Sequence, residues 1–95
     1  MLEDLIAFFE ACASGEELRG EVIGRDQVYD YTIDTCYTAD CGWETAVWKD
    51  DNPMVIVARY ETKEEAEEGH DDWCAVCLLQ PDTVWSIQTE RYEDL

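Results

Sequence analysis

The chain has 95 residues, a length that predicts one domain spanning residues 1–95. It carries 24 Asp and Glu against six Lys and Arg, a formal net charge of −18, and so dense an acidic surface repels nucleic acid and anionic membranes. With four Trp, five Tyr and two Phe, the composition is too aromatic for a disordered chain and predicts a folded domain.

The first segment, MLEDLIAFFEACAS, follows a helical period and predicts an amphipathic helix. It has no basic n-region and carries acids inside its apolar run, which is not the pattern of a signal peptide. No stretch of the sequence is apolar for long enough to span a bilayer. Five cysteines, an odd number, fit reduced thiols better than a disulfide framework. We therefore expect a cytoplasmic protein.

Strand patterns follow. Residues 21–24 predict a weak strand, and residues 29–37 alternate apolar and polar side chains as in a half-buried strand. Residues 42–48 form a further candidate strand. Residues 54–60 are a continuous β-branched run that predicts a central strand, and the turn cluster Asp50-Asp51-Asn52-Pro53 between these two segments predicts a hairpin.

The stretch ETKEEAEEGHDD opens a second predicted helix, with Thr62 and Glu65 as a capping box and Pro81 as a stop signal. One face of this helix would carry Ala66, His70, Trp73 and Cys77. A last strand is predicted over residues 83–89, and the remaining C-terminal residues are expected to fray. The order of elements predicts an α+β fold, with an antiparallel sheet of about four strands and two helices packed on one face. The other face would then carry Asp30, Asp34 and Glu44.

The acids have two interpretations. Carboxylates in the first turn of a helix favour its dipole by about 0.3–1 kcal/mol each, and most charge runs are simply solvated faces. That explanation does not require acids throughout the chain, and only Lys63 accompanies those of the second helix. Same-face residues on a strand are about 6.6 Å apart, which is of the order of the phosphate spacing in a nucleic-acid strand.

Carboxylates on a sheet and a neighbouring helix could therefore imitate a phosphate array and occupy the basic groove of a nucleic-acid-binding protein. The candidate partner-binding residues are Asp30, Asp34, Asp40, Glu44, Glu64, Glu65, Glu67, Glu68, Asp71 and Asp72.

The cysteines and the single histidine also allow two interpretations. If the loop after the strand at 29–37 lies over the second helix, a tetrahedral zinc site could form from Cys36, Cys41, His70 and Cys74. The alternative is that these cysteines are small buried hydrophobes and that His70 is a core or edge histidine with a carboxylate neighbour. The zinc signal is the weaker one, so the main hypothesis includes no cofactor.

No catalytic pattern stands out. No spacing singles out a pair of carboxylates for glycoside hydrolysis, and the calcium-loop pattern is absent because Asp50-Asp51-Asn52 lacks the required glycine. The pair Cys74 and Cys77 lies late in its helix, where the dipole opposes a thiolate. We therefore expect a protein that is not an enzyme.

Two segments, YTIDTCYTADCGWETAVW and MVIVARYETKEEAEEGHDDWC, resemble small acidic proteins of bacteriophages and prophages over roughly residues 29–78. The resemblance implies an anti-defence context, since anti-CRISPR proteins and inhibitors of restriction and repair enzymes include several DNA mimics. It fixes no catalytic residue.

The hypothesis from the sequence is thus a phage-encoded, anti-CRISPR-like inhibitor. It would act in the host bacterial cytoplasm on a basic nucleic-acid-handling protein such as a CRISPR effector, without binding nucleic acid or membrane itself. The alternative is a small structural or adaptor domain, with or without zinc, whose acids serve only solubility.

Overall fold

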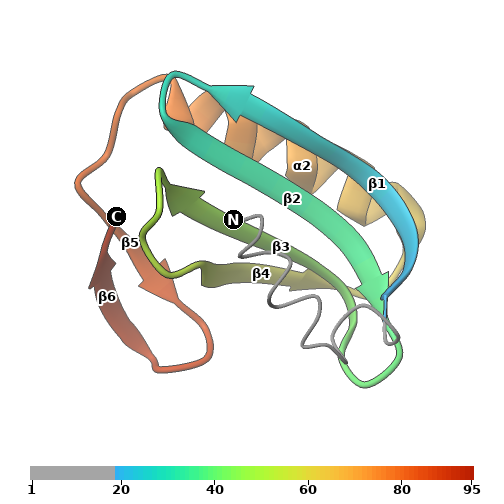
Figure 1. Ribbon diagram of the computed structural model, residues 1–95. Helices are drawn as coiled ribbons and strands as arrows, with labels where there is room; N and C mark the ends of the chain where they lie inside the picture. The colour runs from blue at the N-terminus through green and yellow to red at the C-terminus, as the bar shows by residue number, and fades with distance from the viewer. Residues whose placement is uncertain (1–18) are drawn as a thin grey trace.

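The computed structural model describes residues 19–95, which form six strands and one helix (Figure 1). Strands β1 (Arg19–Val28), β2 (Tyr31–Thr38), β3 (Gly42–Lys49) and β4 (Val55–Tyr60) make an antiparallel sheet in the order β1-β2-β3-β4. Helix α2 (Lys63–Cys77) follows, and β5 (Thr83–Ser86) and β6 (Arg91–Asp94) pair as a second antiparallel sheet. The mixed α+β class and the four-stranded antiparallel sheet are confirmed.

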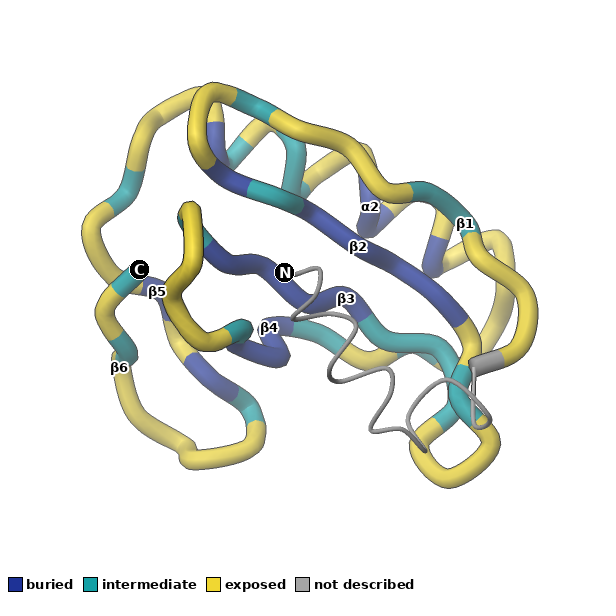
Figure 2. The backbone as a smooth tube through the Cα atoms, in the orientation of Figure 1, coloured by how far each residue is buried: buried dark blue, intermediate teal, exposed yellow. Residues whose placement is uncertain are grey.

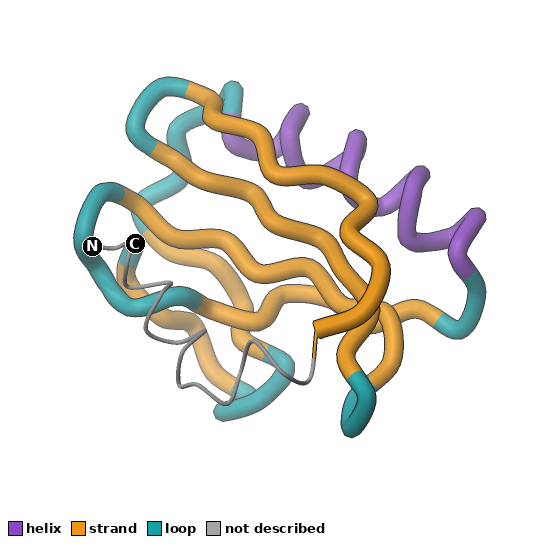
Figure 3. Tube along the Cα trace, turned by 45° about the vertical axis from the view of Figure 1, so that its right-hand side comes forward, coloured by secondary structure: helices purple, strands orange, loops and turns teal. Residues whose placement is uncertain are grey.

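The described residues contain one helix where two were predicted. The predicted N-terminal helix lies outside the described residues. The helix that is described, α2, packs along one face of the four-stranded sheet, behind β1 and β2 in the view of Figure 1 and beside the sheet in Figure 3.

Two strands differ from prediction. The weak strand at 21–24 is the irregular part of a ten-residue edge strand, with register shifts between Arg19 and Gly24. The prediction missed the regularly paired residues 25–28, because Arg25, Asp26 and Gln27 are all polar and exposed and show no alternation. The predicted strand at 83–89 ends at Ser86, because the Ser86 side chain accepts hydrogen bonds from the backbone N–H groups of Gln88 and Thr89 and closes a turn. The residues expected to fray instead form β6.

The predicted hairpin between β3 and β4 is confirmed, with Val47 opposite Val55. Helix α2 begins as predicted at Thr62, whose Oγ1 accepts a hydrogen bond from the Glu65 N–H at 3.1 Å. The Glu65 carboxylate bonds back to the N–H of Glu61 rather than to that of the cap residue. The buried residues of α2 are Ala66, Gly69, His70 and Cys77, so the predicted inner face is confirmed, with Trp73 half-buried.

The main core lies between the sheet and α2. Its buried members are Tyr31, Ile33, Val47, Val55, Val57, Cys77 and Val84. Gly69 lets the helix approach the sheet closely, because a Cβ at that position would overlap the aromatic ring of Tyr60. Figure 2 shows the buried run along β2 and β3 in dark blue.

The opposite face of the sheet carries Asp34 and Glu44, as predicted, but both side chains are largely buried and ion-paired, so this face is not an open acidic surface. Asp30 lies in the turn before β2 instead. Ala46, Trp48 and Ile56 form a second apolar cluster on this face, and half-buried Met54 and Ile87 pack against it. Of the four tryptophans, only Trp48 is buried, and Trp85 is 45% exposed.

Candidate functional site

Helix α2 carries a dense row of carboxylates on its outer surface. Six of the nine residues from Glu64 to Asp72 are acids, and all six side chains are exposed. At about 1.5 Å per residue this run is ~13 Å long, so it holds one negative charge per ~2 Å of axis. Duplex DNA carries one charge per about 1.7 Å. The outer face of α2 therefore approaches the linear charge density of DNA over a little more than two turns.

Favourable helix electrostatics do not account for this row. Only Glu64 and Glu65 lie in the first turn, where the helix dipole stabilises acids, and the last turn has no basic residue. The spacing also places like charges one turn apart, as in Glu67 with Asp71 and Glu68 with Asp72. Each such pair costs about 0.2–0.5 kcal/mol. The acids beyond the first turn therefore carry a small cost in helix stability that the helix dipole does not offset.

The basic side chains do not neutralise this row. Between residues 20 and 95, ion pairs join Arg25 to Asp34, Arg59 to Glu44, Lys63 to Glu21 and Arg91 to Glu93. The remaining cation of this range, Lys49, lies over the ring of Tyr31 at 5.5 Å. Lys63 is on α2 itself, but its partner is on β1. The outer acids of the helix therefore keep their charge uncompensated by an ion pair within this range.

The predicted acids of the sheet lie apart from this row. Asp34 is 6% exposed and accepts a hydrogen bond of 2.8 Å from Arg25, on the sheet face opposite α2. Glu44 lies on that same face, only 15% of its side chain is exposed, and Arg59 donates to it at 3.3 Å. Burial raises the pKa of Glu44, and the hydrogen bond from Arg59 opposes this shift. Neither carboxylate extends the acidic surface of the helix.

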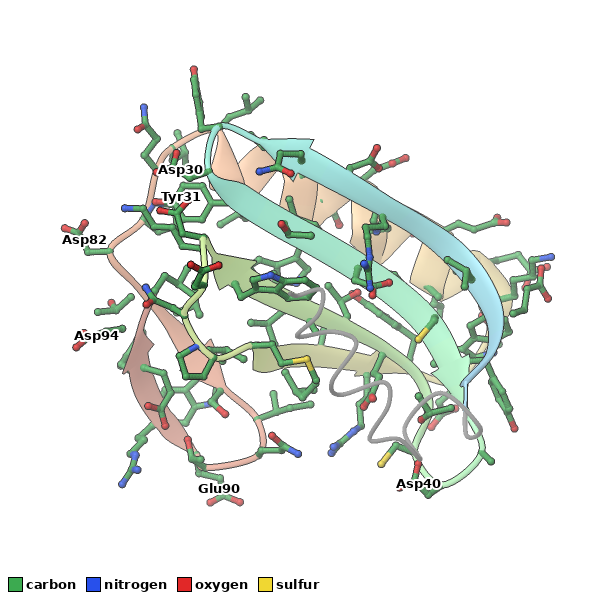
Figure 4. All side chains as sticks on the ribbon, viewed as in Figure 1. Asp30, Tyr31, Asp40, Asp82, Glu90 and Asp94 are labelled. Atoms are coloured by element: carbon green, nitrogen blue, oxygen red, sulfur yellow. The ribbon has the colours of Figure 1, made fainter. Side chains whose placement is uncertain are left out.

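Asp30 and Asp40 are exposed, but they occupy turns at the two ends of β2. Figure 4 shows them at opposite corners of the sheet, with Asp82, Glu90 and Asp94 at other separate points of the periphery. The acids outside α2 are therefore dispersed over several sides. Of the ten sequence-predicted binding residues, the structure brings together the six of the helix.

A buried polar network lies beneath the acidic helix. His70 is 5% exposed and contacts Asp26 of β1 through Nε2 and Thr35 of β2 through Nδ1, both at 2.7 Å. The hydroxyl of Thr35 is 2.6 Å from that of Thr45, which is 3.0 Å from the hydroxyl of Tyr60. The interpretation of His70 as a core histidine with a carboxylate neighbour is confirmed. Gly24 leaves room for the ring, since a Cβ there would lie 3.1 Å from Nε2.

This network has the residue types of a hydrolytic triad but not an accessible nucleophile. Carboxylate, imidazole and hydroxyl follow one another in Asp26, His70 and Thr35, as the chemistry of acyl transfer would require. Thr35, however, is 0% exposed, so its oxygen cannot reach a substrate. The network instead satisfies the polar atoms that α2 buries against the sheet.

The four residues of the predicted zinc site do not converge. Cys36 neighbours Thr35 along β2 and therefore faces the other side of the sheet, and Cys41 is exposed in the turn before β3. Only His70 and Cys74 lie together, and Asp26 joins them: within residues 19–95, one ligand atom from each of these three lies within 4.8 Å of the others. The sequence analysis missed Asp26 because it ended the first strand at residue 24.

The cysteines of α2 are poor nucleophiles. Burial raises the pKa of Cys77 to about 11, with a further contribution from Cys74. Burial also raises the pKa of Cys74, and the carboxylates of Asp26 and Asp71 add to that shift. Both thiols are protonated at neutral pH, which is the opposite of what a redox-active C-x-x-C pair needs.

Comparisons with known proteins do not assign the chain to a family: no family model, curated protein or solved structure matches it. In the described part of the chain, no helix is both long and apolar enough to cross a membrane.

Proposed function

We propose that the protein is an inhibitor that places the acidic face of α2 in the basic nucleic-acid-binding groove of another protein. The observation that carries the proposal is the exposed row of six carboxylates, whose linear density approaches that of duplex DNA and which has no ion-pair partner among the Lys and Arg side chains of residues 20–95. Following the resemblance to small acidic phage proteins, we propose a host defence protein, such as a CRISPR effector, as the partner and the bacterial cytoplasm as the site of action.

The partner's groove would supply the missing positive charge. Lys and Arg side chains that normally hold phosphates would meet carboxylates at similar spacing, and long-range attraction would speed the encounter. The protein would therefore compete with nucleic acid for its partner, because both ligands need the same basic side chains.

Exposed apolar side chains lie beyond the C-terminal end of the acidic row. Leu78 and Leu79, which follow the last turn of α2, are 58% and 80% exposed. Buried apolar anchors commonly contribute more affinity than charges at the rim of an interface. We therefore include these two leucines in the proposed contact surface, which the sequence analysis did not identify.

The experiment combines capture with competition. The full chain, immobilised, is exposed to bacterial lysate at low salt, and bound proteins are eluted with duplex DNA. The proposal predicts that nucleic-acid-binding proteins elute with DNA, and that the purified protein displaces labelled DNA from them in solution.

The variant that tests the surface reverses four charges of the helix, Glu64, Glu67, Glu68 and Asp71, to lysine. A matched variant reverses four exposed acids elsewhere: Asp51, Asp82, Glu90 and Asp94. Displacement should be lost in the first variant and largely kept in the second. Equal displacement by both, with folding verified by circular dichroism, would show that α2 is not the contact surface.

A further inference from the structure

The cluster of Asp26, His70 and Cys74 has no role in the proposed inhibition, and its three side chains offer metal ligands of three kinds. Asp26 comes from the edge strand β1 and the other two from successive turns of α2. His70 Nε2 is 2.7 Å from Asp26 Oδ2, and Cys74 Sγ is 4.0 Å from the same oxygen. From this geometry we propose that the cluster binds one divalent transition-metal ion, with Zn²⁺ the best match.

The separations are close to those of a tetrahedral site. With bonds of about 2.0–2.3 Å, tetrahedral zinc holds N and O ligands ~3.4 Å apart and S and O ligands ~3.6 Å apart. On ion binding, the distances from Asp26 Oδ2 to His70 Nε2 and to Cys74 Sγ would therefore each change by less than about 1 Å. Asp26 has 61% of its side chain exposed and can make that adjustment by rotating, while the buried ring of His70 stays in place.

The second nitrogen of His70 is already held as a metal-binding histidine requires. Zinc-bound histidines donate their other N–H to a fixed acceptor, which orients the ring. Here Nδ1 faces the Thr35 hydroxyl at 2.7 Å, and a hydroxyl can either donate or accept. The neutral ring can therefore carry its proton on Nδ1 and present a bare Nε2 without leaving a buried polar atom unsatisfied.

The proton balance is simple. When the ion binds, the Cys74 S–H bond breaks, the proton passes to solvent, and a sulfur–metal bond forms. The proton of the imidazole, if it is on Nε2, is exchanged for one on Nδ1, and the Thr35 hydroxyl turns from donor to acceptor. The neighbouring carboxylate of Asp26, which disfavours a thiolate on its own, favours the cation.

The ligand types select the metal. A thiolate and an imidazole suit zinc and related transition metals, whereas Ca²⁺ and Mg²⁺ prefer sites made of oxygen. Three protein ligands leave a fourth position, which on the exposed side of Asp26 is open to water. The exposed acids of α2 would also raise the local concentration of cations near the site.

The test uses Co²⁺ as a spectroscopic probe of the purified, reduced full chain. We expect one tightly bound Co²⁺ per chain, a sulfur-to-cobalt charge-transfer band and the visible bands of tetrahedral cobalt, all displaced by Zn²⁺. Cys74→Ser should abolish the charge-transfer band, and Asp26→Asn should weaken binding at least ~10-fold. The matched variants Cys41→Ser and Asp30→Asn, which change the same residue types in exposed turns, should bind as the unaltered protein does.

A second readout needs no variant and so does not depend on whether Cys74→Ser folds. Zn²⁺ should slow the alkylation of Cys74 by iodoacetamide, followed by mass spectrometry, while the exposed Cys41 reacts at an unchanged rate. The proposal would be overturned if several ions bind weakly per chain and if Cys74→Ser and Asp26→Asn do not change that binding. It would also be overturned if Zn²⁺ does not slow the alkylation of Cys74.

Discussion

Thr35 is the residue on which the buried polar network depends, because its single hydroxyl serves both His70 and Thr45. Its side chain is fully buried, so water cannot replace either contact. A buried polar group without a partner costs about 1–3 kcal/mol. The network therefore stabilises the packing of α2 on the sheet only as long as each of its members remains paired.

Thr35→Val keeps the shape of the side chain and removes the hydroxyl. We expect it to lower the free energy of unfolding by about 1–3 kcal/mol, since Nδ1 of His70 and the Thr45 hydroxyl would each lose a partner. Urea denaturation measures the change. Thr32→Val is the matched control, because Thr32 lies on the other face of β2 and its side chain makes no hydrogen bond within the described residues. Equal stability of the two variants would show that the network contributes nothing.

Glu44 gives a pH-dependent prediction. Burial raises its pKa above the ordinary value of 4.5, so just above that pH the folded state holds this proton more tightly than the unfolded state. Its contribution to stability therefore grows as pH falls through its folded pKa and levels off below 4.5.

In Glu44→Gln this contribution is absent, and the urea midpoint should change less with pH in the range directly above 4.5 than it does in the unaltered protein. Glu90→Gln controls for the loss of one charge, because that acid is exposed in the turn before β6. If the urea midpoint of Glu44→Gln depends on pH in the same way as that of the unaltered protein, then Glu44 does not have a raised pKa in the folded state.

At the scale of elements, helix α2 is positioned by a glycine in its middle. Helix propensity alone favours alanine over glycine by about 1 kcal/mol. At Gly69, however, an added Cβ would overlap the Tyr60 ring, which lies on β4 and bonds to Thr45. The close approach of helix and sheet thus outweighs the intrinsic preference of the helix.

Gly69→Ala should therefore destabilise the protein, by about 1–3 kcal/mol as is usual for overpacking. Thermal or urea unfolding shows whether the free energy of unfolding falls or rises in this variant. Ala75→Gly, on the exposed side of the same helix, measures the difference in helix propensity between alanine and glycine without a packing effect. It should lower the free energy of unfolding by about 1 kcal/mol. A gain in stability for Gly69→Ala would mean that the helix does not lie as close to β4 as described.

The elements that could be predicted from sequence are those with strong local signals. The Thr62 cap, the inner face of α2 and the β3–β4 hairpin each depend on a few neighbouring residues, and all three are confirmed. The extent of β1 was not predictable from alternation, because Arg25, Asp26 and Gln27 are all polar and exposed on this edge strand, so no apolar side chain marks an inner face there. With that strand unplaced, Asp26 could not be assigned to His70, 44 residues away in sequence.

The sequence also could not show which acids are exposed and unpaired. Charge is visible in the sequence, but whether a carboxylate is free depends on tertiary pairing. Asp34 and Glu44 follow the same strand alternation as exposed acids would, and only the structure shows that Arg25 and Arg59 lie against them. Within residues 19–95 the contiguous acidic surface is consequently smaller than the sequence implied and is the one on α2, while the other exposed acids are dispersed.

For the whole molecule, the central claim is electrostatic: a cationic groove accepts the outer face of α2 in place of nucleic acid. Proteins that bind phosphates through several basic side chains lose affinity steeply as salt increases. A ligand that uses the same side chains should show the same dependence, reduced in proportion to any charges removed from its contact surface.

The most direct measurement is the dissociation constant between the protein and its DNA-eluted partner as a function of salt. From ~50 to ~200 mM we predict at least a ~10-fold loss of affinity for the unaltered protein. We predict a much flatter dependence when Glu64, Glu67, Glu68 and Asp71 are changed to their amides, and a nearly unchanged one when Asp51, Asp82, Glu90 and Asp94 are. An affinity that is insensitive to salt, or that loses its salt dependence equally in both variants, would contradict the account.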